Sequence, residues 1–337
     1  MPGTDPLLLD EISLLLVWTA VAIYVLAFIA YAIDLARRSD LAIKAKDEVV
    51  ARELVTANGG GVIAAPPASA SDTAPAKPRY LWARMGTALV ALGFLFHLAA
   101  TVLRGVAAER VPWSNMYEFA LTGVLLVVAV YLVVLTRFDL RFLGSLITGL
   151  AVVLLGGATL AFHVEVVPLA DPLKSVWLVI HVFVASLATA LFALAFGLSV
   201  MQLLQTRRER KLALAAASDA PAPRRSFLQT LPNADTLESL AYRFAIVGFI
   251  FWTFTLIAGS IWANDAWGRF WGFDTKEVWT FVIWVLYAGY IHARATRGWR
   301  GTRSAWLSII GFAAVLFNFT IVNVFFKGLH AYSGLTS

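Results

Sequence analysis

Residues 175–204 read SVWLVIHVFVASLATALFALAFGLSVMQLL, thirty residues without a single Asp, Glu, Lys or Arg. A helix needs about 20 apolar residues to cross the hydrocarbon core of a bilayer. The stretch therefore predicts a membrane-spanning helix. The whole chain agrees with it, because 60% of its residues are hydrophobic, only 14% are charged and its mean hydropathy is +0.76. Soluble domains carry about a quarter charged residues.

Seven further apolar runs are also long enough to predict membrane-spanning helices. With the first, they cover residues 12–33, 81–104, 114–136, 142–163, 175–204, 240–262, 277–295 and 304–326. The first run lacks the basic flank and small-residue cleavage site of a signal peptide, so we expect it to remain as a helix. The sequence predicts an all-α polytopic membrane protein of about eight transmembrane helices.

The positions of Lys and Arg predict the orientation of these helices. With the N-terminus outside, the segments between spans carry 19 basic residues on the inner side and 6 on the outer side. Basic residues favour the cytoplasmic side of a membrane. We therefore expect both termini to lie outside. The net charge of +6 follows from the same bias, so the basic composition indicates a lipid bilayer as partner and no nucleic acid.

The runs also divide the chain. We expect an outer segment with the first helix at 1–33, a flexible cytoplasmic loop at 34–80, four helices at 81–204, a basic cytoplasmic linker at 205–239 and three helices at 240–337. Segments 57–79 and 205–235 are rich in Ala and Pro, and neither can build a core. The chain has no cysteine, so any thiol chemistry must come from a partner or substrate.

The densest chemical signal lies between the sixth and seventh runs. Residues 262–279 read WANDAWGRFWGFDTKEVW, with four Trp and two Phe spaced by two glycines. One interpretation is an interfacial aromatic belt. The other is a broad apolar surface on which a planar π-system such as a porphyrin stacks. Asp274 and Glu277 also form the Asp-x-x-Glu pattern of a capping box, which favours Asp274 as the N-cap of the seventh helix.

The five histidines indicate where a porphyrin iron could be held. His181 follows Trp177 by one helical turn near the outer end of its run, and His330 lies just beyond the last run. Two imidazoles from different helices are what bis-histidine haem ligation requires. Each histidine taken singly could equally be a hydrogen-bonded core residue. His292 lies near the inner end of the seventh run, where it could receive haem or be an interfacial histidine. We expect His97 and His163 to be structural.

Four motifs resemble one known family. They are Pro112-Trp-Ser-Asn-Met-Tyr-Glu118, Ser175-Val-Trp-Leu-Val-Ile-His-Val182, the tryptophan-rich Trp267-Gly-Arg-Phe-Trp-Gly-Phe-Asp-Thr-Lys-Glu-Val-Trp279 and Gly328-Leu-His-Ala-Tyr-Ser-Gly334. Their order and content resemble the CcsA family, also named ResC or CcsB, of the system II cytochrome c synthase. Phe273 and Thr275 depart from the Trp and Pro that are frequent in that family. The first helix and the loop at 34–80 match nothing in the pattern.

The resemblance implies a site and a function. It implies that His181 and His330 are axial ligands of haem iron on the outer face and that His292 is an intramembrane iron ligand. It implies that Trp267, Trp271 and Asp274 belong to the haem platform, and we expect Phe273 and Trp279 of the same segment to bind haem as well. The cargo would be haem b, moved across the bilayer and presented for covalent attachment to apocytochromes c with a Cys-x-x-Cys-His motif.

The resemblance further implies partners and a location. A ResB-type membrane subunit and thiol-reducing proteins would act with the chain in a bacterial cytoplasmic membrane, with the haem site on the extracytoplasmic side; a thylakoid membrane is the less favoured location. One alternative function is a haem chaperone or exporter without lyase activity. Another is a transporter or structural subunit whose tryptophans only anchor the interface.

Overall fold

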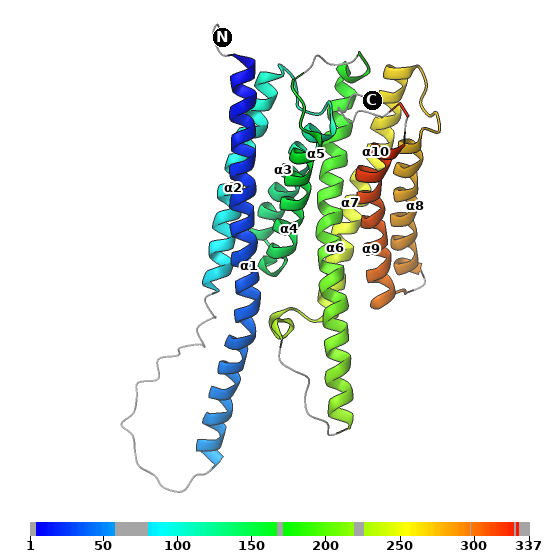
Figure 1. The fold of residues 1–337 in the computed structure, drawn as a ribbon. Helices are drawn as coiled ribbons and strands as arrows, with labels where there is room; N and C mark the ends of the chain where they lie inside the picture. The colour runs from blue at the N-terminus through cyan, green and yellow to red at the C-terminus, as the bar shows by residue number, and fades with distance from the viewer. Residues whose placement is uncertain are drawn as a thin grey trace.

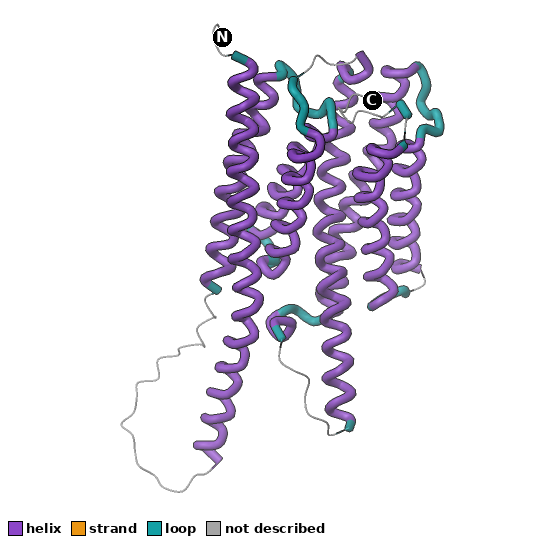
Figure 2. The backbone as a smooth tube through the Cα atoms, in the orientation of Figure 1, coloured by secondary structure: helices purple, strands orange, loops and turns teal. Residues whose placement is uncertain are grey.

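A computed structural model gives the fold. It describes residues 5–57, 80–166, 171–218, 226–296, 298–326 and 328–329, of which 39–57 and 171–172 are described by their backbone alone. The described chain is a bundle of long helices joined by short loops (Figures 1 and 2). The α-helices are α1 Pro6–Ala57, α2 Leu81–Ala107, α3 Met116–Leu135, α4 Gly144–Ala151, α5 Gly157–Phe162, α6 Val176–Ala217, α7 Ala234–Trp267, α8 Thr275–Thr296, α9 Thr302–Phe317 and α10 Asn323–Phe325. The shorter elements are the 3₁₀ turns η1 Arg141–Leu143, η3 Asp171–Lys174 and η4 Phe227–Thr230, and the π-helical turns η2 Val152–Gly156 and η5 Asn318–Val322.

Seven helical segments are long and apolar enough to cross a membrane. They are Pro6–Arg38, Leu81–Ala107, Met116–Leu135, Arg141–Phe162, Val176–Ala217, Ala234–Trp267 and Thr302–Phe325. The predicted all-α polytopic fold is thus confirmed. The eighth predicted span, 277–295, corresponds to α8, which packs against α7 and α9. The many Trp and Tyr residues of α8, together with His292 and Arg294 near its end, lower its hydropathy relative to the other seven.

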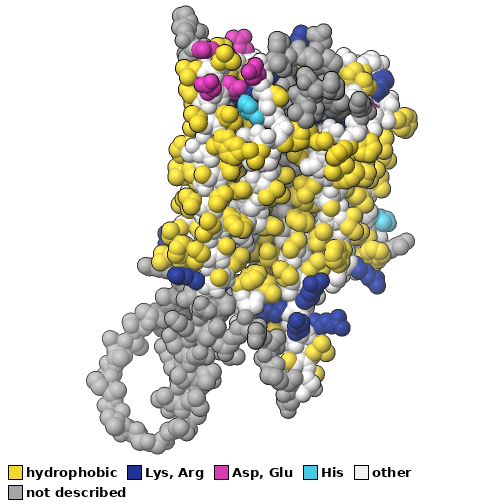
Figure 3. Space-filling model, viewed as in Figure 1, with side chains coloured by type: hydrophobic (Ala, Val, Ile, Leu, Met, Phe, Trp, Pro, Cys, Tyr) yellow, Lys and Arg dark blue, Asp and Glu magenta, His cyan; other side chains and the backbone are white. Residues whose placement is uncertain are grey.

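The two ends of the bundle differ in charge. The helix α1 begins and α10 ends at the same end of the bundle (Figure 1). On the face shown in Figure 3, acidic side chains gather near the start of α1, a broad band of hydrophobic side chains follows, and most Lys and Arg side chains lie toward the other end. This arrangement is what the positive-inside pattern requires if the start of α1 faces outward. We refer to that end as the outer end.

Two helices continue well beyond the ends that the sequence predicted. The helix α1 runs to Ala57 rather than 33, and α6 runs to Ala217 rather than 204. Their extensions are rich in Ala, Leu, Arg, Lys and Glu, which all favour helix. A limit set by hydrophobicity marks where a helix leaves the bilayer, not where it stops. Of the expected flexible segment 57–79, residues 58–79 lie outside the described part of the chain.

The helix α6 lies at the centre of the bundle and contacts α3, α7 and α9. Phe192 of α6 stacks face to face on Tyr287 of α8, with ring centroids 3.7 Å apart and planes 7° apart. A Cβ at Gly248 would lie 2.8 Å from the Phe192 ring, so the glycine allows α7 to approach α6 closely. This core fixes the position of the outer half of α6.

Candidate functional site

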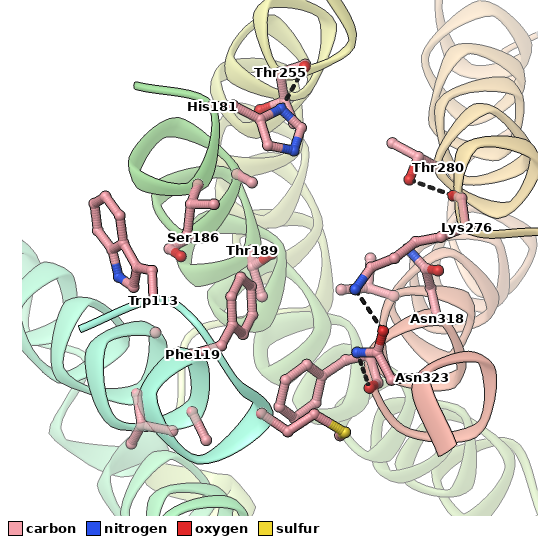
Figure 4. A pocket seen from close by; sticks show the side chains of 18 of the residues that line it. Trp113, Phe119, His181, Ser186, Thr189, Thr255, Lys276, Thr280, Asn318 and Asn323 are labelled. Atoms are coloured by element: carbon pink, nitrogen blue, oxygen red, sulfur yellow. Dashed lines mark hydrogen bonds between the residues drawn. The ribbon is translucent and has the colours of Figure 1, made fainter. Parts of the chain in front are cut away.

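A cavity of about 180 Å³ lies among α3, α6, α7, α8 and α9. Most of its walls are apolar side chains, and polar groups enter it from several helices (Figure 4). The polar residues that line it are Ser114, Asn115, His181, Ser186, Thr189, Thr255, Lys276, Thr280, Asn318 and Asn323. A smaller hollow of about 70 Å³ shares His181, Thr255, Trp262, Lys276 and Thr280 with it. Both hollows therefore meet at one histidine and one lysine.

His181 is held in a defined orientation. The helix that carries it begins at a Ser175 cap, whose hydroxyl accepts from the amide of Trp177 and donates to Asp265 near the end of α7. His181 Nδ1 lies 2.9 Å from the carbonyl oxygen of Thr255. A carbonyl oxygen only accepts hydrogen bonds, so the Nδ1 atom carries a proton, and in the neutral imidazole the Nε2 atom then carries the ring lone pair.

Two residues of α7 give the imidazole its surroundings. Trp262 is buried and stacks on the His181 ring at 5.9 Å with 21° between the planes. A Cβ at Gly259 would lie 2.7 Å from His181 Cε1, so only glycine leaves room for the ring in this position. Among the described residues, the Thr255 carbonyl, the Trp262 ring and the absence of a side chain at Gly259 thus fix the position of the histidine.

The tryptophan-rich segment does not form a single flat surface. Trp267 ends α7 and meets Trp262 edge to face, with ring centroids 4.9 Å apart, and Trp271 lines the smaller hollow. Phe273 is 80% exposed and has a φ of +57°, in the left-handed region that side chains rarely adopt. Trp279 packs on Phe317 of α9 at 4.4 Å and lines neither hollow. The structure therefore places Trp271 on the smaller hollow with His181 and links Trp267 to His181 only through Trp262, while Phe273 and Trp279 line neither hollow.

Asp274 and Glu277 form the predicted capping box. Glu277 accepts from the amide of Asp274 at 3.1 Å and from that of Gly272 at 2.8 Å. Asp274 accepts from the amide of Lys276 at 3.3 Å. Its other oxygen accepts from the amide of Leu329 at 3.0 Å, which the sequence did not indicate. The motif aspartate thus joins the start of α8 to the residue that precedes His330 in the sequence.

The remaining predicted histidines are placed differently. His330 itself lies outside the described residues. His292 is exposed on α8 near its inner end. His97 is fully buried, with Nε2 2.8 Å from the Leu121 carbonyl oxygen, as expected of a structural histidine. His163 lies at the outer end, 4.0 Å from Asp10, and burial lowers its pKa below 6.5.

A buried ionic network supports the outer loop beside the cavity. Arg104 and Glu118 are both 0% exposed and are joined by a hydrogen bond of 3.0 Å. Arg104 also donates to Asp10 of α1 at 2.5 Å, and Arg110 donates to Glu118 at 2.6 Å. Glu118 further accepts from the amide and the hydroxyl of Ser114, both at 2.9 Å. The network holds the loop whose residues 113–115 line the cavity.

Several cavity residues were not identified from the sequence as site residues. Lys276 was seen only as part of the tryptophan-rich motif, and Trp113 only as part of the Pro112–Glu118 motif. Asn318 carried no signal, since an amide side chain in an apolar run is as often structural as functional. The role of a backbone carbonyl such as that of Thr255 cannot be predicted from the residue type, because every residue has one.

Comparison with known proteins agrees with the motifs. Residues 113–330 match the family model described as cytochrome C assembly protein. The protein named cytochrome c biogenesis protein CcsA from Synechococcus elongatus is 33% identical over 282 residues, which cover 74% of this chain and 87% of that protein. The protein of the same name from Guillardia theta is 33% identical over 242 residues, which cover 69% and 80% of the two chains.

One solved structure resembles the whole bundle. The cytochrome c haem lyase CcmF aligns with a TM-score of 0.59 and 17% identity over 95% of this chain. The chain spans about half of that protein, 47% of its length, so the likeness concerns the fold alone. The match over residues 113–330 and the identity to proteins of similar length decide the assignment. The chain belongs to the cytochrome c assembly family, as a member of its CcsA, system II, branch.

Proposed function

We propose that this protein binds haem b in its outer half and presents it for covalent attachment to apocytochrome c. His181 is the axial ligand that the described residues supply, and His330 is the second one. The chain would be the CcsA-type subunit of a haem lyase, working with a ResB-type membrane subunit. The distribution of Lys and Arg supports placing the site on the extracytoplasmic side, and we assign the chain to a bacterial cytoplasmic membrane.

The geometry of His181 carries this proposal. A metal-binding histidine usually donates its other ring N–H to a carbonyl or carboxylate, which fixes the tautomer and the ring orientation. The His181 Nδ1 contact with the Thr255 carbonyl oxygen has this form. The tautomer directs the Nε2 lone pair to the metal, and the ring borders both hollows. A histidine that served only to fill the core would not need a cavity beside it.

The surroundings fit a porphyrin in chemical character. The cavity walls are aromatic and aliphatic, with Phe119, Trp262 and Phe319 among them. Such side chains contact the faces of a planar apolar ring, while a few polar groups fix its orientation. The contact between Asp274 and Leu329 ties the residue that precedes His330 in the sequence to the start of α8, whose Lys276 lines the cavity.

The chain's contribution to the reaction would be orientation. The two thiols of a Cys-x-x-Cys-His segment add across the two vinyl groups, each S–H bond and C=C bond giving one thioether and one C–H bond. The chain has no cysteine, so thiol-reducing partners would keep the apocytochrome thiols reduced. Holding iron and porphyrin in place beside the thiols lowers the entropic barrier of the addition.

His292 supports an entry site on the inner side. It is exposed at the surface of α8, and Phe281 and Val285 of the same helix are 47% exposed. An ionisable residue near membrane depth is a functional candidate by default. A histidine of the ResB-type subunit would complete the coordination of haem iron there, before the haem moves to the outer site.

The test is a comparison of visible spectra. The chain is co-expressed with a ResB-type subunit, purified in detergent and reduced, as wild type and as His181→Ala, His330→Ala and His292→Ala. We expect low-spin bis-histidine bands in the wild type, and their loss, or recovery with added imidazole, in the two outer variants. His163→Gln is the control, since His163 lines neither hollow. Colourless or identical preparations would refute the ligand assignment.

A second assay separates the lyase from the alternative function. A Cys-x-x-Cys-His reporter co-expressed in the same cells would carry covalent haem if the complex is a lyase. A haem chaperone or exporter would retain the bis-histidine spectrum without modifying the reporter. The two readouts together distinguish binding from attachment.

A further inference from the structure

Lys276 enters the cavity from the first turn of α8 and meets an amide rather than a carboxylate. Its Nζ lies 2.5 Å from Asn323 Oδ1, at the right of the cavity in Figure 4, where His181 lies at the top. In the part of the chain that the structure describes, Lys276 forms no ion pair. A cation whose direct hydrogen-bond partner is an uncharged amide is costly to maintain in an apolar cavity. The arrangement suits an anionic group of a ligand at this wall.

The nearby acidic residues are directed elsewhere. The carboxylate of Asp274 accepts from the backbone amides of Lys276 and Leu329. The carboxylate of Glu277 accepts from the amides of Gly272 and Asp274. Both therefore close the turn before α8 and cap the helix. Neither reaches the ammonium group of Lys276 within the distance of an ion pair.

Two further polar groups in the same cavity have no partner among the described residues. Asn318 is 6% exposed and Ser186 is 2% exposed, and neither Asn318 Oδ1 nor Ser186 Oγ has a hydrogen bond there. Most buried polar side-chain atoms in proteins are hydrogen-bonded. Asn318 lies in the π-helical turn η5, and such turns are frequent at functional sites. These groups indicate a polar ligand within the cavity.

We propose that Lys276, together with the donating side-chain NH2 groups of Asn323 and Asn318, binds a carboxylate of the ligand. The inference rests on the proposed function, under which that carboxylate is a propionate of haem. His181 and Lys276 line the same two hollows, so one porphyrin can contact both with its iron and its edge. An ammonium–carboxylate pair with supporting amides is a charge-assisted interaction, stronger than a hydrogen bond between neutral groups. It fixes the rotation of the porphyrin about the iron–His181 axis, and hence which edge faces the incoming thiols.

The test compares two porphyrins that differ only at the carboxylates. Iron protoporphyrin IX and its dimethyl ester are titrated into the complex with the ResB-type subunit, and binding is followed by the Soret band. We expect the wild type to prefer the free acid by about 10- to 100-fold, the range for a hydrogen bond to a charged group. Lys276→Met should remove the preference while leaving the affinity for the ester within about twofold. Lys276→Arg should retain part of it.

The controls separate this inference from the proposed function. Lys211→Met makes the same substitution on the exposed inner part of α6 and should keep the wild-type preference. Lys276→Gln provides a second neutral variant if Lys276→Met does not give a monodisperse complex. A preference that persists in both neutral variants overturns the carboxylate site, while haem binding stands. A wild type that binds neither porphyrin overturns the proposed function itself.

Discussion

Asp274→Ala should destabilise the protein, because Asp274 joins the start of α8 to the Gly328–Leu329 segment. The substitution removes the cap from the Lys276 amide and the acceptor from the Leu329 amide. Loss of an N-cap costs about 0.5–2 kcal/mol, and loss of a hydrogen bond to a charged group costs about 1.5–3 kcal/mol. Because the contact with Lys276 is only partly buried and the contact with Leu329 is exposed, we expect a loss of unfolding free energy near the lower end of the sum, about 2–3 kcal/mol. Asp274→Asn keeps a side-chain oxygen that can cap the Lys276 amide, so its loss of unfolding free energy should be about half that of Asp274→Ala.

Gly328 makes this prediction specific. A Cβ at Gly328 would lie 2.1 Å from Asp274 Oδ1, so Gly328→Ala should push the segment away from the aspartate. In the Asp274→Ala background the obstructing oxygen is gone, and Gly328→Ala should cost little. The free energy of unfolding of the four proteins, from denaturant titration in detergent, completes a double-mutant cycle. Residues that do not touch give additive effects, so additive costs would refute the contact between α8 and the Gly328–Leu329 segment.

Three other perturbations test different parts of the structure. Glu118→Leu should cost about 3–5 kcal/mol of stability, because it leaves Arg104 buried with one of its two carboxylates missing. Gly259→Val should abolish the haem spectrum in a folded protein, since even a Cβ would displace the His181 ring. Lowering the pH below about 6.5 should destabilise the protein through His163, because the unfolded chain then binds a proton that the folded state, with its lowered pKa, resists.

Each of these three has its own control. Thermal unfolding of Glu118→Gln, which keeps the shape of the side chain, should show a smaller loss than Glu118→Leu. Gly157→Val alters a glycine whose Cβ would meet nothing within 4 Å, so the haem spectrum should persist. His163→Gln should flatten the stability profile below about pH 6.5. A profile that keeps its slope in this variant would assign the acid sensitivity to another group.

The parts of the fold that could be predicted are local in sequence. An apolar run predicts a spanning helix from its own composition, and the Asp274–Glu277 capping box needs only residues three apart. The helical extensions of α1 and α6 were missed because hydrophobicity says nothing about a helix in water. The contacts that build the cavity join residues far apart, such as His181 and Thr255 at a separation of 74 or Lys276 and Asn323 at 47. No pattern in a single sequence pairs them.

The Arg104 network has a consequence for how this protein can be divided. The family match begins at residue 113, yet Glu118 inside it is bonded to Arg104, which is bonded to Asp10 of α1. Cutting the chain at the start of the match would leave a buried carboxylate with part of its charge compensation removed. The two N-terminal helices are therefore an integral part of the folding unit, and the region that the family model matches is smaller than the region that must fold together.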